Sequence, residues 1–398
     1  MSNPTASSDC KPILKPKRRL YSRFLAAHPD TLHMSPHSHY YWPDVTRQAQ
    51  LDYWDDSARF VDEKWNEIFS RRMPRVQQLI AERLNLDYPE QIVFAPNTHE
   101  FVYRILSCLP LGKPLRILTT DSEFHSFNRQ SRRVLERGNV SIEVVATEPF
   151  ATLPSRWQQA VAAHHYDLIF ISQVFFNSGV AAPPPSAWLT HVQSDETIIV
   201  VDGYHGFAAV PTDWSAYQHR VFYLAGGYKY AQAGEGVCFA VVPKGCQLRP
   251  EYTGWFADFA SLAKPQIGPV NYASDGMRMA GSTMDFSALY RMQAVLELWQ
   301  QEGLTDLVVN DYIRSLQEAF LTHIDGLAHP DLNRGNLLVE DLSTHGHFFT
   351  FKLDSAARVE ALAARLKSQG VATDFRHDRL RFGFALYQSS DDYAQILG

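Results

Sequence analysis

The sequence of 398 residues contains only four cysteines, Cys10, Cys108, Cys238 and Cys246. None of them has the spacing of a metal-ligand pair, so no metal site is predicted. Cys108 and Cys238 lie within apolar runs, where a thiol is typically buried and unreactive. Buried free thiols are typical of a reducing compartment, and we therefore expect a cytoplasmic protein.

The sequence also lacks an excess of positive charge and any long apolar run. Its 37 lysines and arginines are outnumbered by 43 acidic residues, which gives a formal net charge of -6. Nucleic acids and anionic membranes both select basic surfaces, so neither is an expected partner. No apolar run approaches the roughly 18 residues that a membrane-spanning helix needs. We therefore expect a soluble globular protein.

The N-terminal segment has basic residues but no apolar stretch after them. A secretory signal requires that apolar stretch, so no such signal is predicted. The polar composition instead predicts a disordered tail over residues 1–25.

What the sequence does contain is a series of short apolar runs that alternate with helix-like segments. The runs are apolar throughout, which is typical of strands buried on both faces of a parallel sheet covered by helices. They occupy residues 91–95, 116–120, 142–147, 168–176, 197–203, 220–225 and 237–242.

The remaining segments suggest how the chain is divided. Residues 47–84 carry apolar side chains at three- and four-residue spacing, which predicts helix, and the chain is again helical after residue 287. A second α/β section follows near the C-terminus. We predict an N-terminal segment over 26–70 that packs on the small domain, a large α/β domain over 71–289 with a mostly parallel seven-stranded sheet, and a smaller α+β domain over 290–398.

Asn97 and Thr98 follow the first apolar run and precede a helical stretch. Either residue is a good helix cap, a purely structural role. The same helix start, with its free N–H groups at the carboxyl end of a strand, also suits a phosphate group. Both interpretations are open at this point.

Asp202 directly follows a buried five-residue apolar run, and His205 comes three residues later. A carboxylate in such a place is costly unless it is paired or lies in a pocket. Ligands of open α/β sheets bind at the carboxyl ends of the strands. We therefore interpret the two side chains as facing one site.

Lys229 lies between two tyrosines in the glycine-rich stretch GGYKYAQAGEG, residues 226–236, with apolar runs on both sides. Burial disfavours the ammonium form of a lysine, so its pKa falls and the amine becomes nucleophilic. That suits Schiff-base chemistry. A lysine, a buried carboxylate and a phosphate-binding helix start are together the groups that pyridoxal phosphate (PLP) needs. PLP is the predicted cofactor, and an amino acid is the predicted small-molecule substrate.

Beyond these residues, the chain resembles the fold type I PLP-dependent enzymes of the aminotransferase class V group, and among them most closely the kynureninases. The resemblance extends from about Pro36 to Tyr387. It implies a PLP-dependent transferase-like large domain and a smaller C-terminal domain. Its motifs are Asp202 with His205, Tyr228-Lys229-Tyr230, Gly254-Trp255-Phe256, Gly281-Ser282-Thr283, Asp374-Phe375-Arg376 and Leu380-Arg381-Phe382-Gly383.

The resemblance implies a catalytic set of three residues. Lys229 forms the Schiff base and moves the substrate proton, Asp202 holds the ring nitrogen, and Tyr228 is an acid/base partner that also contacts the phosphate. Phe124 stacks on the cofactor ring, and His205 lies near its phenolic oxygen. The residues implied to contact the cofactor are Asn97, Thr98, Phe124, Asp202, His205, Tyr228, Lys229, Trp255, Ser282 and Thr283.

The resemblance also implies a homodimer with shared active sites. Trp255, Ser282 and Thr283 would reach across the interface to the cofactor phosphate of the neighbouring subunit. Arg381 would grip the α-carboxylate of the substrate, a task that suits the two-pronged guanidinium group. His37 and Ser38 would border the substrate.

Several reactions are compatible with these residues. The first is kynureninase-like hydrolytic cleavage of the Cβ–Cγ bond of kynurenine or a related γ-oxo amino acid. The second is an aminotransferase on an unidentified amino acid. A cysteine desulfurase or sulfur lyase is a third, although a desulfurase normally needs a cysteine in its C-terminal section and none follows Cys246. A non-enzymatic relative is the fourth.

Overall fold

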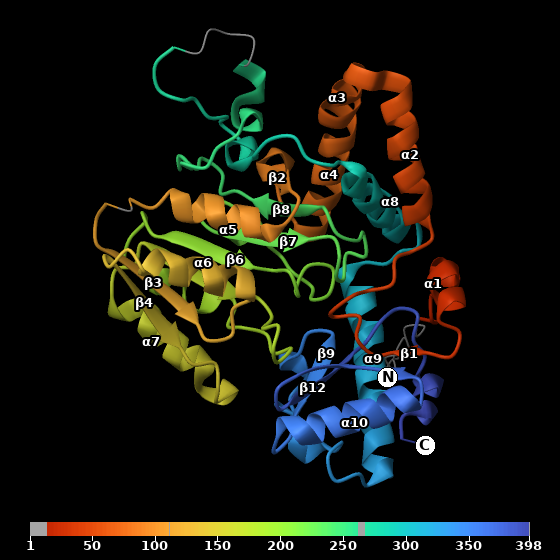
Figure 1. The fold of residues 1–398 in the computed structure, drawn as a ribbon. Helices are drawn as coiled ribbons and strands as arrows, with labels where there is room; N and C mark the ends of the chain where they lie inside the picture. Colours follow the sequence, from red (N-terminus) through yellow and green to blue (C-terminus); the bar gives the residue numbers. More distant parts are fainter. Residues whose placement is uncertain (1–13, 111, 262–266, 398) are drawn as a thin grey trace, which may run out of the picture.

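A central sheet of seven strands organises the structure, a computed structural model that describes residues 14–110, 112–261 and 267–397 (Figure 1). The strand order is β2-β8-β7-β6-β5-β3-β4, and only β8 runs against the others. The predicted α/β class with a mostly parallel seven-stranded sheet is confirmed. The strands are β2 Ile92–Ala95, β3 Leu115–Thr120, β4 Val140–Val145, β5 Leu168–Ser172, β6 Ile198–Asp202, β7 Phe222–Gly226 and β8 Cys238–Val241.

Burial along the strands follows their position in the sheet. Every residue of β2, β5, β7 and β8 is buried, as expected for strands covered on both faces. The edge strand β4 differs, because only Val140 is fully buried and Val144 is half exposed. The expectation that all seven runs are buried on both faces is therefore wrong for β4, whereas β2, at the opposite edge of the sheet, is buried throughout.

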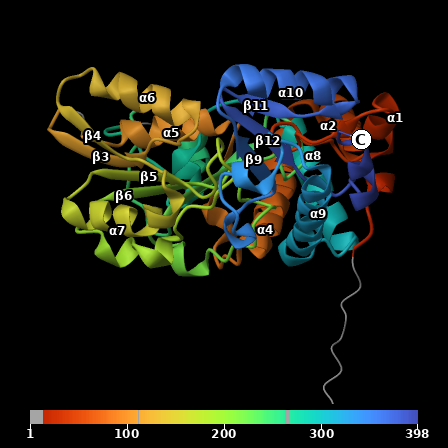
Figure 2. The same cartoon turned by 90° about the horizontal axis from the view of Figure 1, so that it is seen from below.

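Helices cover both faces of the central sheet (Figure 2). Helices α5 Thr98–Ser107 and α6 His125–Leu135 lie on one face, and α4 Met73–Leu84 and α7 Leu153–Ala163 lie on the other. In α5 the buried residues Phe101, Val102, Ile105 and Leu106 recur at helical spacing and pack onto the sheet. The resulting three layers leave the strand ends free to form a site.

The helical pattern over residues 47–84 forms several elements rather than one. Helix α2 Val45–Phe60 packs against α8 Ser287–Gln301 and ends where Val61 adopts a positive φ of 49°. The chain then turns through α3 Lys64–Glu67 and a π-helical turn into α4. The predicted boundary at 289/290 falls inside α8, and the division into domains remains a prediction.

A second, three-stranded sheet is formed near the C-terminus. Its order is β11-β12-β9, with β9 Phe348–Lys352, β11 Asp374–Arg376 and β12 Arg379–Gly383 all antiparallel. Helices α9 Asp306–Leu327 and α10 Ala356–Ser368 pack around it (Figures 1 and 2). The N-terminal strand β1 Leu32–His33 pairs with β10 Val371–Ala372, so the segment predicted over 26–70 contacts this part of the chain through β1.

The predicted disordered tail is wrong for residues 14–25. A 3-10 turn over Arg18–Tyr21 leads into α1 Ser22–Ala27, and Tyr21 is fully buried. The Tyr21 ring packs on Tyr387, 5.1 Å between centroids, and its hydroxyl donates to Gln232 Oε1 at 2.6 Å. Residues 1–13, the remainder of that prediction, lie outside the described residues. In the described part of the chain, no helix combines the length and apolar character that crossing a membrane requires.

Candidate active site

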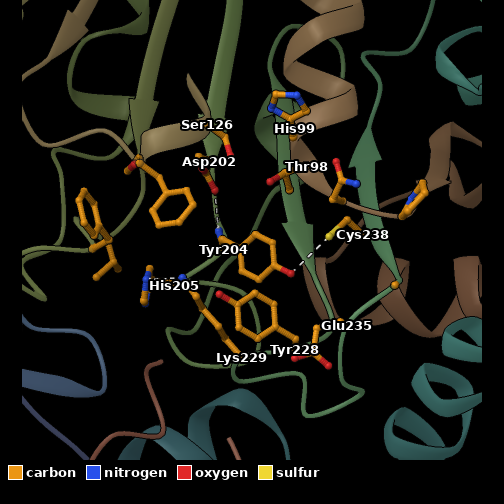
Figure 3. A pocket seen from close by; sticks show the side chains of 17 residues that line it. Thr98, His99, Ser126, Asp202, Tyr204, His205, Tyr228, Lys229, Glu235 and Cys238 are labelled. Atoms are coloured by element: carbon orange, nitrogen blue, oxygen red, sulfur yellow. Dashed lines mark hydrogen bonds between the residues drawn. The ribbon is translucent and has the colours of Figure 1, made fainter. Parts of the chain in front are cut away.

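A cavity of about 200 Å³ lies at the carboxyl edge of the central sheet (Figure 3). Because β2, β3, β5, β6 and β7 point the same way, the residues that follow them meet at this edge. Figure 3 shows the side chains converging from these strand ends. The lining residues are Pro96, Asn97, Thr98, His99, Phe124, Ser126, Ser172, Val174, Phe176, Asp202, Tyr204, His205, Tyr228, Lys229, Glu235, Gly236 and Cys238.

Lys229 is carried by the connection between β7 and the antiparallel β8. The connection is closed at its base by a hydrogen bond from the Gly227 N–H to the Val237 carbonyl at 2.8 Å. Gly226 has to be glycine here, because a Cβ would collide with the Cys238 sulfur and the Tyr204 hydroxyl. The lysine therefore stands on a short, tightly constrained loop rather than on a mobile one.

Arg291 on α8 holds the same loop from outside. Its Nε donates to the Ala233 carbonyl at 2.7 Å and its Nη2 donates to the Glu235 carbonyl at 2.6 Å. Two carbonyls of an irregular segment thus find a donor, which the buried Ala233 in particular requires.

The environment of Lys229 favours the neutral amine. Burial lowers the pKa of Lys229 to about 7, the carboxylate of Asp202 opposes the shift, and the charges of Arg381 and Arg376 add to it. Its Nζ lies 2.6 Å from His205 Nε2. Burial and the neighbouring lysine lower the pKa of His205 well below its usual value, so the imidazole is neutral. A neutral amine at neutral pH is the form that attacks a carbonyl carbon.

Asp202 ends β6 and lies beside the last residue of β5, Ser172, in the sheet register. Its Oδ1 accepts the Tyr204 N–H at 3.0 Å. Burial raises the pKa of Asp202, and the N–H bond and the Lys229 charge oppose that shift. A cationic group placed beside this carboxylate would stabilise its ionised form.

A second buried carboxyl, Glu123, lies behind Ser172. Both of its oxygens accept hydroxyl protons, from Thr120 and from Ser172, each at 2.6 Å. Burial raises the pKa of Glu123 to about 8, although the two hydroxyls lower it. Glu123 is therefore a neutral acid at neutral pH and adds no second negative charge next to Asp202.

The N-terminus of α5 borders the cavity. The Asn97 side chain accepts the Glu100 N–H at 3.0 Å, so the capping role expected of Asn97 is present. Thr98 and His99, the first two residues of the helix, line the cavity. The positive end of the helix thus lies where an anion would be stabilised.

Aromatic rings form the walls of the cavity. Phe124 and Phe176 pack edge to face with centroids 5.3 Å apart, and Tyr204 packs against Tyr228 at 5.4 Å. The Lys229 Nζ lies 5.3 Å from the Phe124 centroid and 5.0 Å from that of Tyr204. A flat ring bound between these walls would lie next to the lysine amine.

The residues present fit PLP. A buried amine of low pKa, a buried carboxylate, aromatic walls and a helix N-terminus surround one cavity. In addition, the buried Nδ1 of His205 has no hydrogen-bond partner within the described ranges, as expected of a group that meets a polar ligand atom.

Three further predicted residues lie beside the cavity without lining it. Arg381 is buried, its Nη1 donates to the Phe176 carbonyl at 2.6 Å and its Nη2 pairs with Asp374. His37 lies with Nε2 3.5 Å from the same Asp374 carboxylate. Ser38 contacts His39, whose ring lies 5.7 Å from that of Tyr228. They form the border of the cavity on the side of the C-terminal sheet.

Trp255, Ser282 and Thr283 are brought together elsewhere. The Phe256 N–H donates to the Gly281 carbonyl at 3.1 Å, which joins the two segments. Trp255 is 40% exposed, and Ser282 and Thr283 are exposed as well. None of the three lines the cavity, and their implied role across a dimer interface remains a prediction.

Several lining residues were not predicted. Tyr204 lies between Asp202 and His205 in sequence, and that position was the available signal. Phe176 had no such signal, because a phenylalanine after an apolar run is most often a core residue. Cys238 was predicted only as a buried thiol, and it is buried, with its sulfur 3.3 Å from the Tyr204 hydroxyl.

Comparison with known proteins identifies relatives of the sequence and of the fold. The family model described as aminotransferase class-V matches residues 43–375. A search of curated proteins found no match.

Among solved structures, a C-DES mutant with glycine covalently linked to the PLP cofactor is similar with a TM-score of 0.81 at 18% identity, over 96% of this chain and 98% of that one. A complex of the cystine C–S lyase C-DES with its product cysteine persulfide is similar with a TM-score of 0.78 at 18% identity, over 94% of this chain and 98% of that one. The apo cysteine desulfurase from Thermococcus onnurineus NA1 is similar with a TM-score of 0.76 at 14% identity, over 97% of each chain. At these identities the likeness shows the fold, and none of the three is a kynureninase.

Proposed function

The chain belongs to the aminotransferase class V family and is a PLP-dependent enzyme of fold type I; from this premise we propose that it cleaves a carbon–sulfur bond at the β-carbon of an α-amino acid. One arrangement supports an α-amino acid as the substrate: the buried amine of Lys229 and the buried guanidinium of Arg381 lie at the border of one cavity. The choice of the carbon–sulfur bond is supported by the likeness to the cystine C–S lyase C-DES. An α-amino acid offers a matching pair of groups, an amine and a carboxylate.

The cofactor would be held by the residues at the strand ends. Lys229 would bind it covalently, Asp202 would pair with its ring nitrogen, and the N-terminal end of α5 would take the phosphate. Phe124, which lines the cavity, would cover the ring. When bound, PLP supplies an electron-accepting ring that stabilises negative charge at the substrate Cα.

Arg381 would bind and orient the substrate. Its Nη1 and Nη2 are held by the Phe176 carbonyl and by Asp374, and its buried Nε has no partner within the described ranges. A buried guanidinium fixed in this way gives a carboxylate a defined position at little entropic cost. The substrate Cα is thereby directed toward Lys229.

Lys229 would move the protons of the reaction. Its low pKa makes the free amine a base near neutral pH, and the Nζ takes the proton from the substrate Cα. The Cβ–S bond breaks as the Cα–Cβ double bond forms, and Lys229 returns its proton to the departing sulfur. His205, 2.6 Å from the amine, keeps Lys229 oriented during the exchange. After addition of water, the products are a thiol, pyruvate and ammonia.

The cysteine at the cavity supports release of the sulfur rather than its capture. Burial raises the pKa of Cys238 to about 12, so it stays a thiol at neutral pH. A thiol is a poor nucleophile compared with the thiolate. The proposal therefore follows the C–S lyase reaction named for C-DES and does not use a sulfur acceptor on the chain.

A second candidate is the kynureninase-like cleavage of a Cβ–Cγ bond. The aromatic lining favours it, because Phe124, Phe176, Tyr204 and Tyr228 offer a surface for an aromatic side chain. The groups required at Cα are the same in both reactions. The two candidates differ in the bond that is broken at the β-carbon, Cβ–S in the first and Cβ–Cγ in the second.

Product analysis without an added keto acid tests the proposal. We expect the PLP-loaded enzyme to release pyruvate from L-cystine, measured by coupling the release to lactate dehydrogenase. Lys229→Ala should abolish both this release and the absorbance of the lysine-bound cofactor. Anthranilate and alanine from L-kynurenine would instead support the second candidate. Turnover of either amino acid only after addition of pyruvate or 2-oxoglutarate would identify an aminotransferase and contradict both.

A further inference from the structure

The C-terminal sheet carries three arginines on the face that borders the cavity. In the antiparallel register, Arg376 on β11 stands opposite Arg379 on β12, and Asp374 stands opposite Arg381. Residues directly opposite one another project from the same face of a sheet. Arg376, Arg379 and Arg381 therefore share a face, and β11 offers it one carboxylate, that of Asp374.

Two of these arginines have carboxylate partners and one does not. Arg381 pairs with Asp374, and Arg379 pairs with Glu148. Across the described ranges, no carboxylate lies within ion-pairing distance of Arg376. Like charges directly opposite on neighbouring strands destabilise a sheet. Glu148 compensates the charge of Arg379, and Asp374 feels the charge of Arg376, but Arg376 itself makes no ion pair in the described part of the chain.

Arg376 is nevertheless held in a defined place. Its Nη1 donates to His125 Nε2 at 3.0 Å, and its guanidinium lies 5.5 Å from the centroid of the Phe176 ring. The two contacts orient the group without neutralising it. An oriented and unpaired guanidinium is suited to bind an anion from outside the chain.

The position of Arg376 is at the border of the cavity. Phe176, against which it packs, lines the cavity, and the Phe176 carbonyl accepts a hydrogen bond from Arg381. One aromatic residue is thus contacted by both arginines. The field of Arg376 also reaches the interior, because after burial and Asp202 the charges of Arg381 and Arg376 are the next contributors to the pKa of Lys229.

A basic track extends outward from this point along α6. The helix begins at His125 and presents Arg129, Arg132 and Arg133 to a shallow cavity of about 670 Å³. Of these, only Arg133 has an acidic partner in the described chain, Glu136. On a protein of net charge -6, such a track attracts anions toward Arg376.

Resting on the proposed function, we propose that Arg376 binds a second anionic group of the substrate, at the end opposite to the α-carboxylate that Arg381 takes. The substrate is then an α-amino acid whose side chain ends in a carboxylate or a similar anion. The leaving sulfur lies between the two anionic ends. A neutral side chain of the same length leaves Arg376 unpaired and binds more weakly.

Two matched probes test this reading, S-carboxymethyl-L-cysteine and S-carbamoylmethyl-L-cysteine. They have the same length and differ only in the charge of the distal group. The dissociation constant of each is measured from the change in cofactor absorbance on the PLP-loaded enzyme, and kcat/KM from pyruvate release. We expect the enzyme to prefer the carboxymethyl probe roughly tenfold or more, the effect of one charge-assisted hydrogen bond.

The Arg376→Gln variant should lose this preference, measured within the variant as the ratio of the two dissociation constants, so that any general effect of the lost charge on Lys229 cancels. Arg376→Lys keeps the positive charge but lacks the paired N–H donors of the guanidinium, so it should retain part of the preference. This variant also provides a test if the glutamine variant folds poorly. Arg365→Gln removes an exposed arginine of α10 in the same part of the chain and should keep the full preference.

Two results overturn the inference while leaving the proposed function intact. One is equal binding of both probes by the unchanged enzyme, and the other is a preference that persists in Arg376→Gln. If neither probe alters the cofactor absorbance or yields pyruvate, and L-cystine does not either, the proposed function fails and the inference fails with it.

Discussion

At the scale of single residues, the buried Glu123 should make the stability of the protein depend on pH, an effect that can be tested without knowing the reaction. Its pKa in the folded protein is raised to about 8 by burial, whereas in the unfolded chain it has its ordinary, lower value. Below that ordinary value both states are protonated, and the contribution to stability is fully present. As the pH rises toward 8, the unfolded state releases the proton and the folded state does not, so the contribution is lost.

Glu123→Gln should therefore gain stability relative to the unchanged protein as the pH rises. The amide still accepts a hydroxyl proton but does not titrate. Denaturation curves at pH 5, 6.5 and 8 give the free energy of unfolding of each protein. The value for the variant minus the value for the unchanged protein should increase with pH, by at most about 1.4 kcal/mol per pH unit. A difference that is constant over this range would contradict the raised pKa.

The predictable site residues are those whose chemistry conflicts with their surroundings. Lys229 and Asp202 are charged residues in apolar or glycine-rich contexts, and both line the cavity. Tyr204 and Phe176 line it as well, but an aromatic residue in an apolar context gives no conflict to detect. Arg381 could be assigned only by resemblance, because nothing local in the sequence brings β12 to the central sheet.

At the scale of elements, the loop between β7 and β8 depends on a helix distant in sequence. Arg291 of α8 is the donor to two carbonyls of this loop. We expect Arg291→Met to lower the free energy of unfolding by roughly 2 kcal/mol, since the carbonyl of the buried Ala233 and that of Glu235 lose a charged donor. It should also weaken cofactor retention, measured by dialysis and absorbance, because Lys229 is on the same loop.

Arg75→Met is the matched control for this substitution. Arg75 pairs with Glu297 of the same helix α8, but its side chain is 39% exposed. An exposed pair contributes at most about 1 kcal/mol. Equal losses of cofactor in the two variants would show that the loop does not depend on Arg291.

The direction of one strand explains which site residues were missed. In a parallel sheet the site residues follow the strands, and this rule locates the sites on β2, β3, β6 and β7. Strand β8 is antiparallel, so the residues that precede it lie at the same edge. Glu235, Gly236 and Cys238 line the cavity for that reason. An apolar run does not reveal whether its strand is parallel or antiparallel to its neighbours. The end of β8 that borders the cavity could therefore not be predicted.

At the scale of the whole molecule, we predict a homodimer whose active sites are shared. Trp255, Ser282 and Thr283 form an exposed group outside the cavity of their own chain. If this group completes the site of a neighbouring subunit, Trp255→Ala and Lys229→Ala are each inactive alone. Mixing the two after reversible dissociation should restore activity, because one site of each hybrid dimer is then intact. No restoration in verified hybrids, or a fully active monomer in sedimentation, would contradict the prediction.

The central sheet could be predicted from the sequence because each strand carries its own signal. The contacts of residues 14–25 could not be predicted, because Leu20 and Tyr21 are only two apolar residues in a polar context. Their burial depends on partners such as Tyr387, more than 300 positions away. Long-range packing of this kind overrides local composition.

The pairing of β1 with β10 has a consequence for motion. The Gly383 N–H donates to the Met34 carbonyl at 2.6 Å, and the Lys17 N–H donates to the Leu386 carbonyl at 2.7 Å, which binds the early chain to the C-terminal sheet. His37 and Arg381, which both approach Asp374, are therefore joined through the same sheet. Any displacement of the C-terminal sheet relative to Lys229 would therefore carry the two ends of the described chain together, and with them the His37 and Arg381 side chains.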